Sequence, residues 1–217
     1  MQEIKKWAAA NGIDISCLQL EKLIVHQQMV LEKNRLMNLT AITDPVEFEV
    51  KHIIDSLTLL PYIQGAKTLA DIGSGAGFPG VVLAIMRPDM RVTLIDSLRK
   101  RVFFLQEVAE RLELTNIEAV HSRAEDRRQG DKFDICTARA VASMDKLAKW
   151  ILPLVKPGGT FLAMKGPDVT DELDKAKPAI ARHGGWVKAV DRVEIGKGIV
   201  HSVVAIDAKY SKRIFHS

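Results

Sequence analysis

The segment best suited to chemistry is a glycine-rich loop that follows one short apolar run and precedes another. It reads Asp71-Ile72-Gly73-Ser74-Gly75-Ala76-Gly77-Phe78-Pro79-Gly80. Glycines let the backbone turn tightly and let a ligand approach the main chain, and a helix that starts after such a loop presents unpaired N–H groups. The order strand, loop, helix predicts a ligand site at the carboxyl end of the first strand of a doubly wound sheet.

The spacing of this loop fits two nucleotide-binding patterns in part. Gly75 and Gly80 have the spacing of a phosphate-binding P-loop, but Val81-Val82 stands where Lys-Ser/Thr is required, which disfavours ATP or GTP hydrolysis. Gly75-x-Gly77-x-x-Gly80 also matches the dinucleotide fingerprint, and Asp96 follows about twenty residues later, where an acid holds ribose hydroxyls. An NAD(P)-dependent oxidoreductase is therefore one alternative.

The acids around the loop favour a cationic ligand instead. A carboxylate of Asp71 at the mouth of the first strand would repel phosphates and attract positive charge, and Phe78-Pro79 makes the loop bulky where a pyrophosphate would sit. Asp71-x-Gly-x-Gly-x-Gly followed by Asp96 resembles the cofactor loop of class I S-adenosylmethionine-dependent methyltransferases. That cofactor has an ammonium and a sulfonium, and the resemblance implies that Asp96 accepts hydrogen bonds from its ribose hydroxyls.

The elements that must position the loop fall into two parts. Residues 1–64 carry helical patterns without strands, with a capping box at Ser16 and Gln19 ahead of a long helix and a second helix start at Asp44-Pro45-Val46-Glu47. We expect a helical extension that packs on the core. Residues 65–217 are expected to form the methyltransferase domain.

In that second part, short apolar runs alternate with helical patterns, which predicts βαβ units. The last two runs flank Gly196-Lys197-Gly198 and predict an antiparallel hairpin. We therefore expect an α/β fold with a doubly wound, mainly parallel seven-stranded sheet of the Rossmann-like type. The expected strands are 68–72, 91–96, 117–121, 133–137, 160–164, 186–195 and 199–207, and the expected helices are 80–86, 98–112, 144–155 and 169–183.

Composition sets the wider limits. The 217 residues are 47% hydrophobic and 27% charged, as in ordinary globular proteins, which excludes disordered and fibrous classes. The longest apolar run, residues 81–86, is far short of the ~20 residues of a membrane span. No secretory leader is recognised, so we expect a cytoplasmic protein with Cys17 and Cys136 as buried, reduced thiols and with no metal site. The net charge of +4 is compatible with a polyanionic partner.

Further motifs resemble the ribosomal RNA small subunit methyltransferase G family, also called glucose-inhibited division protein B, over nearly the whole chain. The resemblance implies transfer of a methyl group from S-adenosylmethionine to N7 of one guanine in the 530 loop of 16S ribosomal RNA. The motifs are Asn34-Arg35-Leu36-Met37-Asn38-Leu39-Thr40, His52-Ile53-Ile54-Asp55-Ser56-Leu57, Asp71 to Gly80, Ile95-Asp96-Ser97, Ser122-Arg123-Ala124-Glu125, Thr137-Ala138-Arg139-Ala140 and Met164-Lys165-Gly166.

The resemblance also implies roles for single residues. Arg139, at the end of the fourth strand, is the catalytic candidate, whereas His52 and Asp55 are expected to pack and cap rather than catalyse. Cofactor contacts are expected from Asp71, Gly73, Gly75, Gly77, Phe78, Asp96, Ser97, Ala124, Glu125 and Arg139, and RNA contacts from Arg123, Arg139, Lys165 and Lys197.

The implied reaction needs little acid–base chemistry. Guanine N7 has a lone pair in the neutral base, so direct displacement at the sulfonium methyl requires no general base, only an in-line approach at ~3–3.5 Å and suitable electrostatics. Arg139 would hold O6 or the adjoining phosphate. The expected partner is 16S ribosomal RNA or the small ribosomal subunit, with no membrane and with the protein as a monomer. A non-catalytic ribosome-binding module with the same fold is a second alternative.

Overall fold

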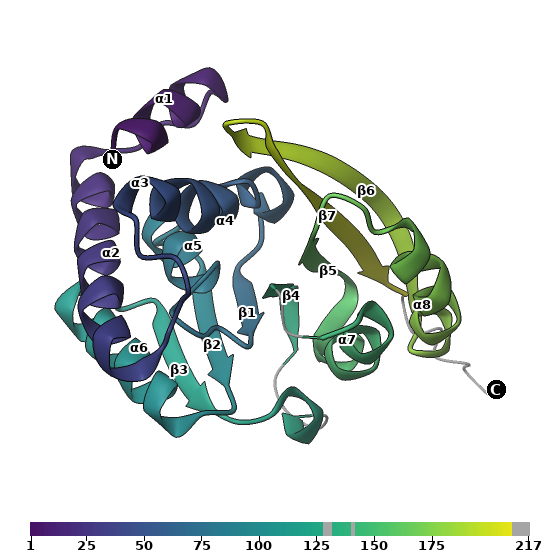
Figure 1. The fold of residues 1–217 in the computed structure, drawn as a ribbon. Helices are drawn as coiled ribbons and strands as arrows, with labels where there is room; N and C mark the ends of the chain where they lie inside the picture. Colours follow the sequence, from purple (N-terminus) through teal and green to yellow (C-terminus); the bar gives the residue numbers. More distant parts are fainter. Residues whose placement is uncertain (128–131, 140–141, 210–217) are drawn as a thin grey trace.

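A computed structural model of the chain describes residues 1–127, 132–139 and 142–209. Its centre is a seven-stranded sheet with the order β3-β2-β1-β4-β5-β7-β6 (Figure 1). The first five strands pair in parallel, and β7 runs antiparallel to β5 and β6. This confirms the expected mainly parallel sheet with a C-terminal hairpin. The strands are β1 (Thr68–Ile72), β2 (Arg91–Asp96), β3 (Ile117–His121), β4 (Phe133–Arg139), β5 (Val155–Lys165), β6 (Gly185–Gly196) and β7 (Ile199–Ala208).

Helices cover both faces of this sheet, because side chains that alternate along the strands supply two separate cores. Leu69 belongs to the core shared with α5 and α6, whereas its neighbour Ala70 belongs to the core shared with α7 and α8. The helices are α5 (Gly80–Met86), α6 (Arg99–Arg111), α7 (Met144–Ile151) and α8 (Thr170–Arg182).

The predicted helix over residues 144–155 is four residues too long. In the structure α7 ends at Ile151, a 3₁₀ turn spans Leu152–Leu154, and Val155 already begins β5. Pro153 explains the early end, because proline has no N–H to continue the hydrogen-bond pattern of an α-helix. The strand β5 is correspondingly longer than predicted.

The first 64 residues are helical, as expected. They form α1 (Gln2–Ala10), α2 (Cys17–Met37), α3 (Pro45–Phe48), a π-helical turn (Glu49–Ile54), α4 (Asp55–Leu57) and a 3₁₀ turn (Leu60–Ile63). The predicted capping box is present, since Gln19 N donates to Ser16 Oγ at 3.2 Å and Ser16 N donates to Gln19 Oε1 at 2.9 Å. The helix α2 lies beside α6 (Figure 1), where Lys33 pairs with Glu107 at 2.7 Å.

This helical segment shares one core with the sheet. Ile4, Leu23 and Phe48 belong to the same buried cluster as Leu69 and Leu94 of the first two strands. Burial of apolar surface is the main stabilising term in folding. Residues 1–64 therefore pack on the sheet through a continuous core.

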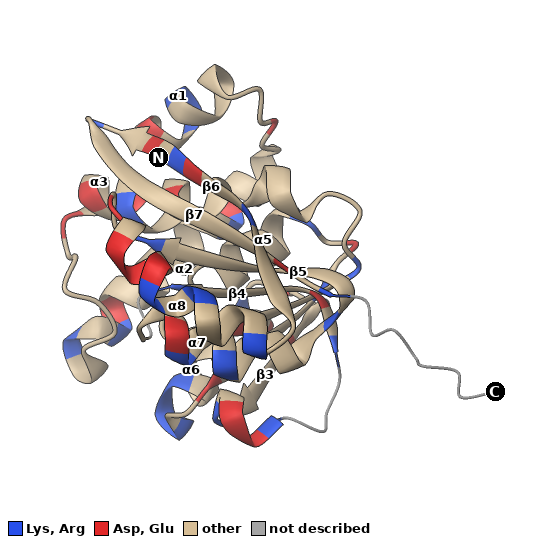
Figure 2. Cartoon of the chain, turned by 90° about the vertical axis from the view of Figure 1, so that its right-hand side faces the viewer, with Lys and Arg blue, Asp and Glu red and all other residues tan. Residues whose placement is uncertain are grey.

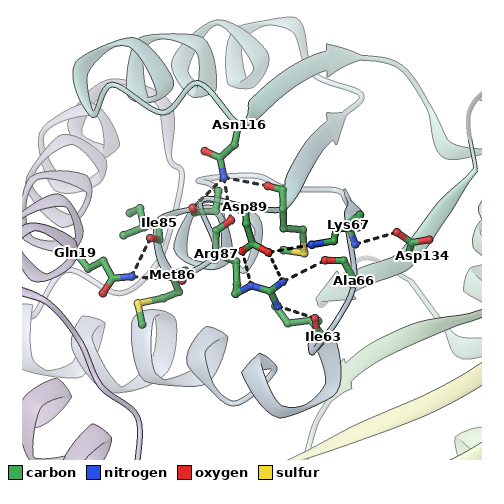
Figure 3. A network of polar contacts seen from close by, with 12 residues as sticks. Gln19, Ile63, Ala66, Lys67, Ile85, Met86, Arg87, Asp89, Asn116 and Asp134 are labelled. Carbon is green, nitrogen blue, oxygen red and sulfur yellow. Dashed lines mark hydrogen bonds and ion pairs between the residues drawn. The ribbon is translucent and has the colours of Figure 1, made fainter.

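A polar network fixes the end of α5 at the edge of the sheet where β1 begins (Figure 3). Arg87 donates to the carbonyl oxygens of Ile63 at 2.8 Å and Ala66 at 3.2 Å, which ties the end of the helical segment to α5. The Asn116 amide donates to three carbonyl oxygens at the end of α5 and in the turn after it, at 3.0–3.2 Å. Carbonyl groups that the end of a helix leaves unpaired are thereby satisfied.

The two cysteines differ from the sequence-based expectation. Cys136 is buried in β4, and burial raises the pKa of its thiol. Cys17 is exposed at the first residue of α2, so the expectation that it is buried was wrong. Across the residues with described positions, none of the helices combines the length and the apolar character that crossing a membrane requires.

Candidate functional site

The glycine loop connects β1 to α5 through backbone conformations that favour glycine. Gly73, Gly75 and Gly77 have φ values of 73°, 57° and 96°. A Cβ atom at Gly77 would lie 2.5 Å from Val81 Cγ2, so this position is restricted by space as well as by conformation. The predicted tight turn between the first strand and its helix is therefore confirmed.

Asp71 lies beneath the loop rather than at its mouth. The side chain is fully buried, and Oδ2 accepts a hydrogen bond from Gly80 N at 3.0 Å, at the first residue of α5. Burial raises the pKa of this carboxyl to about 6. Asp71 thus points toward the start of α5, whose unpaired N–H groups need an acceptor. Its expected contact with the cofactor stays a prediction.

Two neighbouring hollows border the loop. The larger has a volume of ≈ 610 Å³, the smaller one of ≈ 250 Å³, and Gly73 and Ser97 line both. Of the predicted cofactor residues, Gly73, Gly75, Phe78, Asp96, Ser97 and Arg139 line the larger hollow, and Gly73, Ser97, Ala124 and Glu125 line the smaller. Asp71 and Gly77 line neither hollow.

Asp96 connects the glycine loop to the loop after β2. Its Oδ2 accepts from Gly75 N at 2.9 Å, and its Oδ1 accepts from Leu98 N at 2.8 Å. Arg101 Nη1 lies 3.5 Å from Oδ2, and Asp96 itself is 2% exposed. Each carboxylate oxygen has more than one acceptor position, so a ligand in the larger hollow can still bond to it.

Phe78 forms an aromatic stack with two histidines from the N-terminal segment. Its ring centroid lies 4.7 Å from that of His26 and 4.8 Å from that of His52, with interplanar angles of 28° and 13°. The Arg139 guanidinium carbon lies 5.5 Å from the same ring centroid, within the range of a cation–π interaction. The loop, the extension and β4 therefore meet at one aromatic ring.

His26 holds the glycine loop directly, a role that sequence reasoning missed. Its Nε2 donates to the Ala76 carbonyl oxygen at 2.9 Å, since a carbonyl can only accept, and its Nδ1 has no hydrogen-bond partner among the described residues. Burial lowers the pKa of His26 to about 4, so the ring is neutral at pH 7. No metal-binding or catalytic spacing around His26 could have indicated this contact.

Arg139 is held by acceptors from the N-terminal segment. Nη1 donates to the Lys51 carbonyl oxygen and to Asp55 Oδ2, both at 2.9 Å, and Nη2 donates to His52 Nδ1 at 3.1 Å. His52 and Asp55, expected only to pack and cap, therefore bind the catalytic candidate. His52 in turn donates from Nε2 to Thr40 Oγ1 at 2.8 Å.

The protonation state of His52 follows from these partners. Because Nδ1 accepts from a guanidinium, it carries no proton, and the ring is neutral. Burial and the Arg139 charge lower the pKa of His52 to about 3. A neutral, hydrogen-bonded imidazole at this position orients Arg139 and does not exchange protons near pH 7.

A third hollow of ≈ 200 Å³ lies on another side of Arg139. It is lined by Asp55, Arg139, Met164, Lys165, Gly166 and His201. Lys165 donates at 2.7 Å to both the Ala142 carbonyl oxygen and Glu172 Oε1. Arg139 is thus the residue common to this hollow and the ≈ 610 Å³ hollow.

Three of the four predicted RNA contacts line one of the hollows described above, and the fourth does not. Arg139 and Lys165 line the third hollow, and the exposed Arg123 lines the ≈ 250 Å³ hollow. Lys197 is exposed in the hairpin turn with φ 55° and lines none of these hollows. The hairpin supplies His201 to the site instead, and no motif in the sequence pointed to that residue.

The chain is similar to known proteins over most of its length. Residues 19–200 match the model of the GidB family, described as rRNA small subunit methyltransferase G. A Ribosomal RNA small subunit methyltransferase G from Clostridium perfringens (strain SM101 / Type A) is 43% identical over 211 residues, covering 94% of this chain and 88% of that protein. The corresponding protein of Clostridium botulinum (strain Eklund 17B / Type B) is 44% identical over 208 residues, covering 93% and 87%.

Solved structures share the fold. A methyltransferase from Pyrococcus furiosus superimposes with a TM-score of 0.57 at 17% identity, covering 87% of this chain and 98% of that chain. The M. jannaschii protein TYW2, solved in complex with AdoMet, gives a TM-score of 0.54 at 17% identity, covering 65% and 68%. The family match and the sequence identities show that the chain belongs to the ribosomal RNA small subunit methyltransferase G family.

Proposed function

We propose that the protein transfers a methyl group from S-adenosylmethionine to N7 of a guanine in the 530 loop of 16S ribosomal RNA. The observation that carries this proposal is the place of Arg139, which lines both the ≈ 610 Å³ hollow beside the glycine loop and the ≈ 200 Å³ hollow beside Lys165. One cationic side chain is thereby in reach of a cofactor on one side and a nucleotide on the other.

The residues of the two hollows beside the loop suit the cofactor. Asp96 keeps acceptor positions for ribose hydroxyls, and Ala124 and Glu125 line the smaller hollow, where we place the adenine. When bound, S-adenosylmethionine supplies an electrophilic methyl group on a sulfonium. Gly73 and Ser97 line both hollows, so one elongated ligand can occupy them together.

The chain's own part in the reaction is to bind and orient. Guanine N7 attacks with its own lone pair, so no residue has to remove a proton. Arg139 has N–H groups left to hold O6 of the base or the adjoining phosphate, since among the described residues only the two Nη1 protons and one Nη2 proton are bonded. We place the target base in the ≈ 200 Å³ hollow, next to Lys165 and Gly166.

Binding of the RNA rests on scattered basic residues. Both basic and acidic side chains lie on α6, α7 and α8 (Figure 2), and the net charge is only +4. We propose that the protein acts as a monomer, in the cytoplasm, on ribosomal RNA or the small subunit. In this proposal residues 1–64 position the site, and residues 65–217 bind the cofactor and substrate.

Transfer of a labelled methyl group tests the proposed function. Small ribosomal subunits that lack the modification are incubated with the protein and methyl-tritiated S-adenosylmethionine. We expect tritium in 16S ribosomal RNA with the wild-type protein, and with Arg139→Ala a much larger loss in the rate of transfer than in the affinity for S-adenosylhomocysteine. Equal losses of transfer and of cofactor affinity would place Arg139 with the cofactor. Binding of the cofactor without any transfer would favour a non-catalytic module.

A further inference from the structure

Asp55 lies between two side chains from distant parts of the chain, Arg139 and His201. Its Oδ2 accepts from Arg139 Nη1 at 2.9 Å, and its Oδ1 pairs with Nδ1 of His201. Asp55 begins α4, Arg139 ends β4, and His201 lies near the start of β7. Their side chains are 9%, 20% and 10% exposed. A single carboxylate therefore joins the N-terminal segment, the fourth strand and the C-terminal hairpin.

His201 is held at both ring nitrogens. Thr58 Oγ1, which donates to the backbone carbonyl oxygen of Asp55 at 2.6 Å, lies 3.3 Å from His201 Nε2. The Asp55 carboxylate, which already accepts from Arg139, also accepts from His201 Nδ1. One carboxylate therefore binds Arg139 through Oδ2 and His201 through Oδ1.

The orientation of Arg139 depends on the Asp55 carboxylate. Asp55 and the Lys51 carbonyl oxygen bind both Nη1 protons, and His52 binds one Nη2 proton. The remaining Nε–H and Nη2–H groups lie in the plane that these bonds define, because the guanidinium is rigid and planar. The direction in which Arg139 offers donors to a ligand is thus set from the N-terminal segment.

We propose that Asp55 and His201 are positioning residues for Arg139 in methyl transfer, an inference that rests on the proposed function. A buried ion pair contributes little net stability, because desolvation offsets the attraction. Orientation of a group at a reaction centre has a large effect on the rate. Asp55 holds the guanidinium between the two hollows, and His201 keeps the carboxylate from rotating toward solvent.

Asp55→Asn and His201→Gln test the proposal in the full-length protein with small subunits as substrate. We expect kcat for methyl transfer to fall about 10- to 100-fold in each, the size expected for the loss of one hydrogen bond between charged groups. The affinity for S-adenosylhomocysteine, measured by calorimetry, should stay unchanged. Glu107→Gln, which breaks the surface pair with Lys33 between α2 and α6, is the matched control and should leave both quantities unchanged.

A double-mutant cycle separates positioning from a general structural role. If Asp55 and His201 act through Arg139, adding either substitution to Arg139→Ala should lower kcat little further. If the fold losses in kcat of the two single variants multiply fully in the double variant, or if cofactor affinity falls in parallel, the proposal is overturned. Should Asp55→Asn fail to fold in a thermal melt, the cycle of His201→Gln with Arg139→Ala decides alone, because His201→Gln by itself keeps both Asp55 and its pair with Arg139. A wild-type protein without transfer would instead contradict the proposed function.

Discussion

Asp96 serves the loop and, in our account, the cofactor. Both of its oxygens accept backbone N–H groups, from Gly75 and Leu98. Asp96→Asn keeps a carbonyl oxygen as acceptor but removes the charge. We expect it to weaken binding of S-adenosylhomocysteine by roughly 1.5–3 kcal/mol, the range for a hydrogen bond to a charged group. Isothermal calorimetry measures the affinity. The control is Asp89→Asn, which removes the charge of a carboxylate that pairs with Arg87 far from the site. An unchanged affinity would refute the ribose assignment.

Gly166 offers a steric test of where the target base binds. A Cβ atom added there meets none of the described atoms within 4 Å, and the backbone is not in the left-handed region, so the backbone accepts a side chain at this position without strain. Gly166 lines the third hollow but neither hollow assigned to the cofactor. Gly166→Leu should lower methyl transfer on the order of 100-fold, as displacement of a reacting group does, and Gly166→Ala should lower it less.

The readouts for Gly166 are initial rates of tritium transfer, cofactor affinity and melting temperature. An active Gly166→Leu protein with normal cofactor binding would place the target base elsewhere. Loss of cofactor affinity in the same variant would show that the substitution reaches the other hollows.

Single side chains were the least predictable part of the site. Gly73, Gly75 and Asp96 could be assigned from local spacing, because a tight turn and a strand end are local features. His26 and His201 could not, since each contacts residues 50 or more positions away: Ala76 in one case and Asp55 in the other. The direction of the Asp71 side chain could not be predicted either, because spacing does not tell whether an acid at the end of a strand turns toward the ligand or toward the next helix.

At the scale of elements, α2 acts as a support for the glycine loop through His26. The pKa of His26 is lowered from 6.5 in a free side chain to about 4 by burial. Protonation therefore favours the unfolded chain: this contribution to stability is complete above about pH 6.5 and is lost as the pH falls toward 4. Between about pH 8 and pH 5 the loss should be about 2 kcal/mol.

His26→Gln isolates this contribution, because an amide N–H can still donate to the Ala76 carbonyl oxygen but does not titrate. The free energy of unfolding, from urea titrations at several pH values, should fall by about 2 kcal/mol less in His26→Gln than in the wild type between pH 8 and pH 5. His52 and Asp71 titrate in both proteins and cancel in the comparison. Identical pH profiles would show that His26 is not held neutral by the fold.

Most elements could be predicted because their signals are local. The first three strands and α5 match the expected ranges, and the capping box at Ser16 marks the start of α2. The π-helical turn Glu49–Ile54 had no such signal. It depends on tertiary contacts, such as those of the buried Glu49 with the backbone N–H groups of Glu3 and Ile4 at 3.1 and 3.4 Å.

At the scale of the whole molecule, a mixed surface and a small net charge predict modest, salt-dependent RNA binding. Lysines and arginines that contact phosphates release counterions, so the affinity for a 530-loop RNA should fall as salt rises. If Lys197 contacts a phosphate, Lys197→Ala should reduce the slope of log affinity against log salt by about one. Fluorescence anisotropy measures it, with Lys177→Ala as control, since Lys177 is paired with Asp174. A flat salt profile would argue against phosphate contacts.

The overall architecture could be predicted from the sequence, whereas the contact between the N-terminal helical segment and the C-terminal hairpin could not. Alternating patterns predict the parallel sheet and the hairpin. The contact between the two ends of the chain, where Trp7 Nε1 donates to the Glu194 carbonyl oxygen at 3.3 Å, depends on how the helical segment packs against the hairpin. The same packing brings Asp55, Arg139 and His201 together.

Mass spectrometry of the 530-loop fragment of 16S ribosomal RNA tests the central claim most directly. The RNA is taken from small subunits treated with S-adenosylmethionine and either the wild-type protein or Arg139→Ala. The account predicts one added methyl group on a single guanine with the wild-type protein, with the chemical lability of an N7-methylated base, and little or none with the variant. A methyl group at another base or position, or none with the wild-type protein, would contradict it.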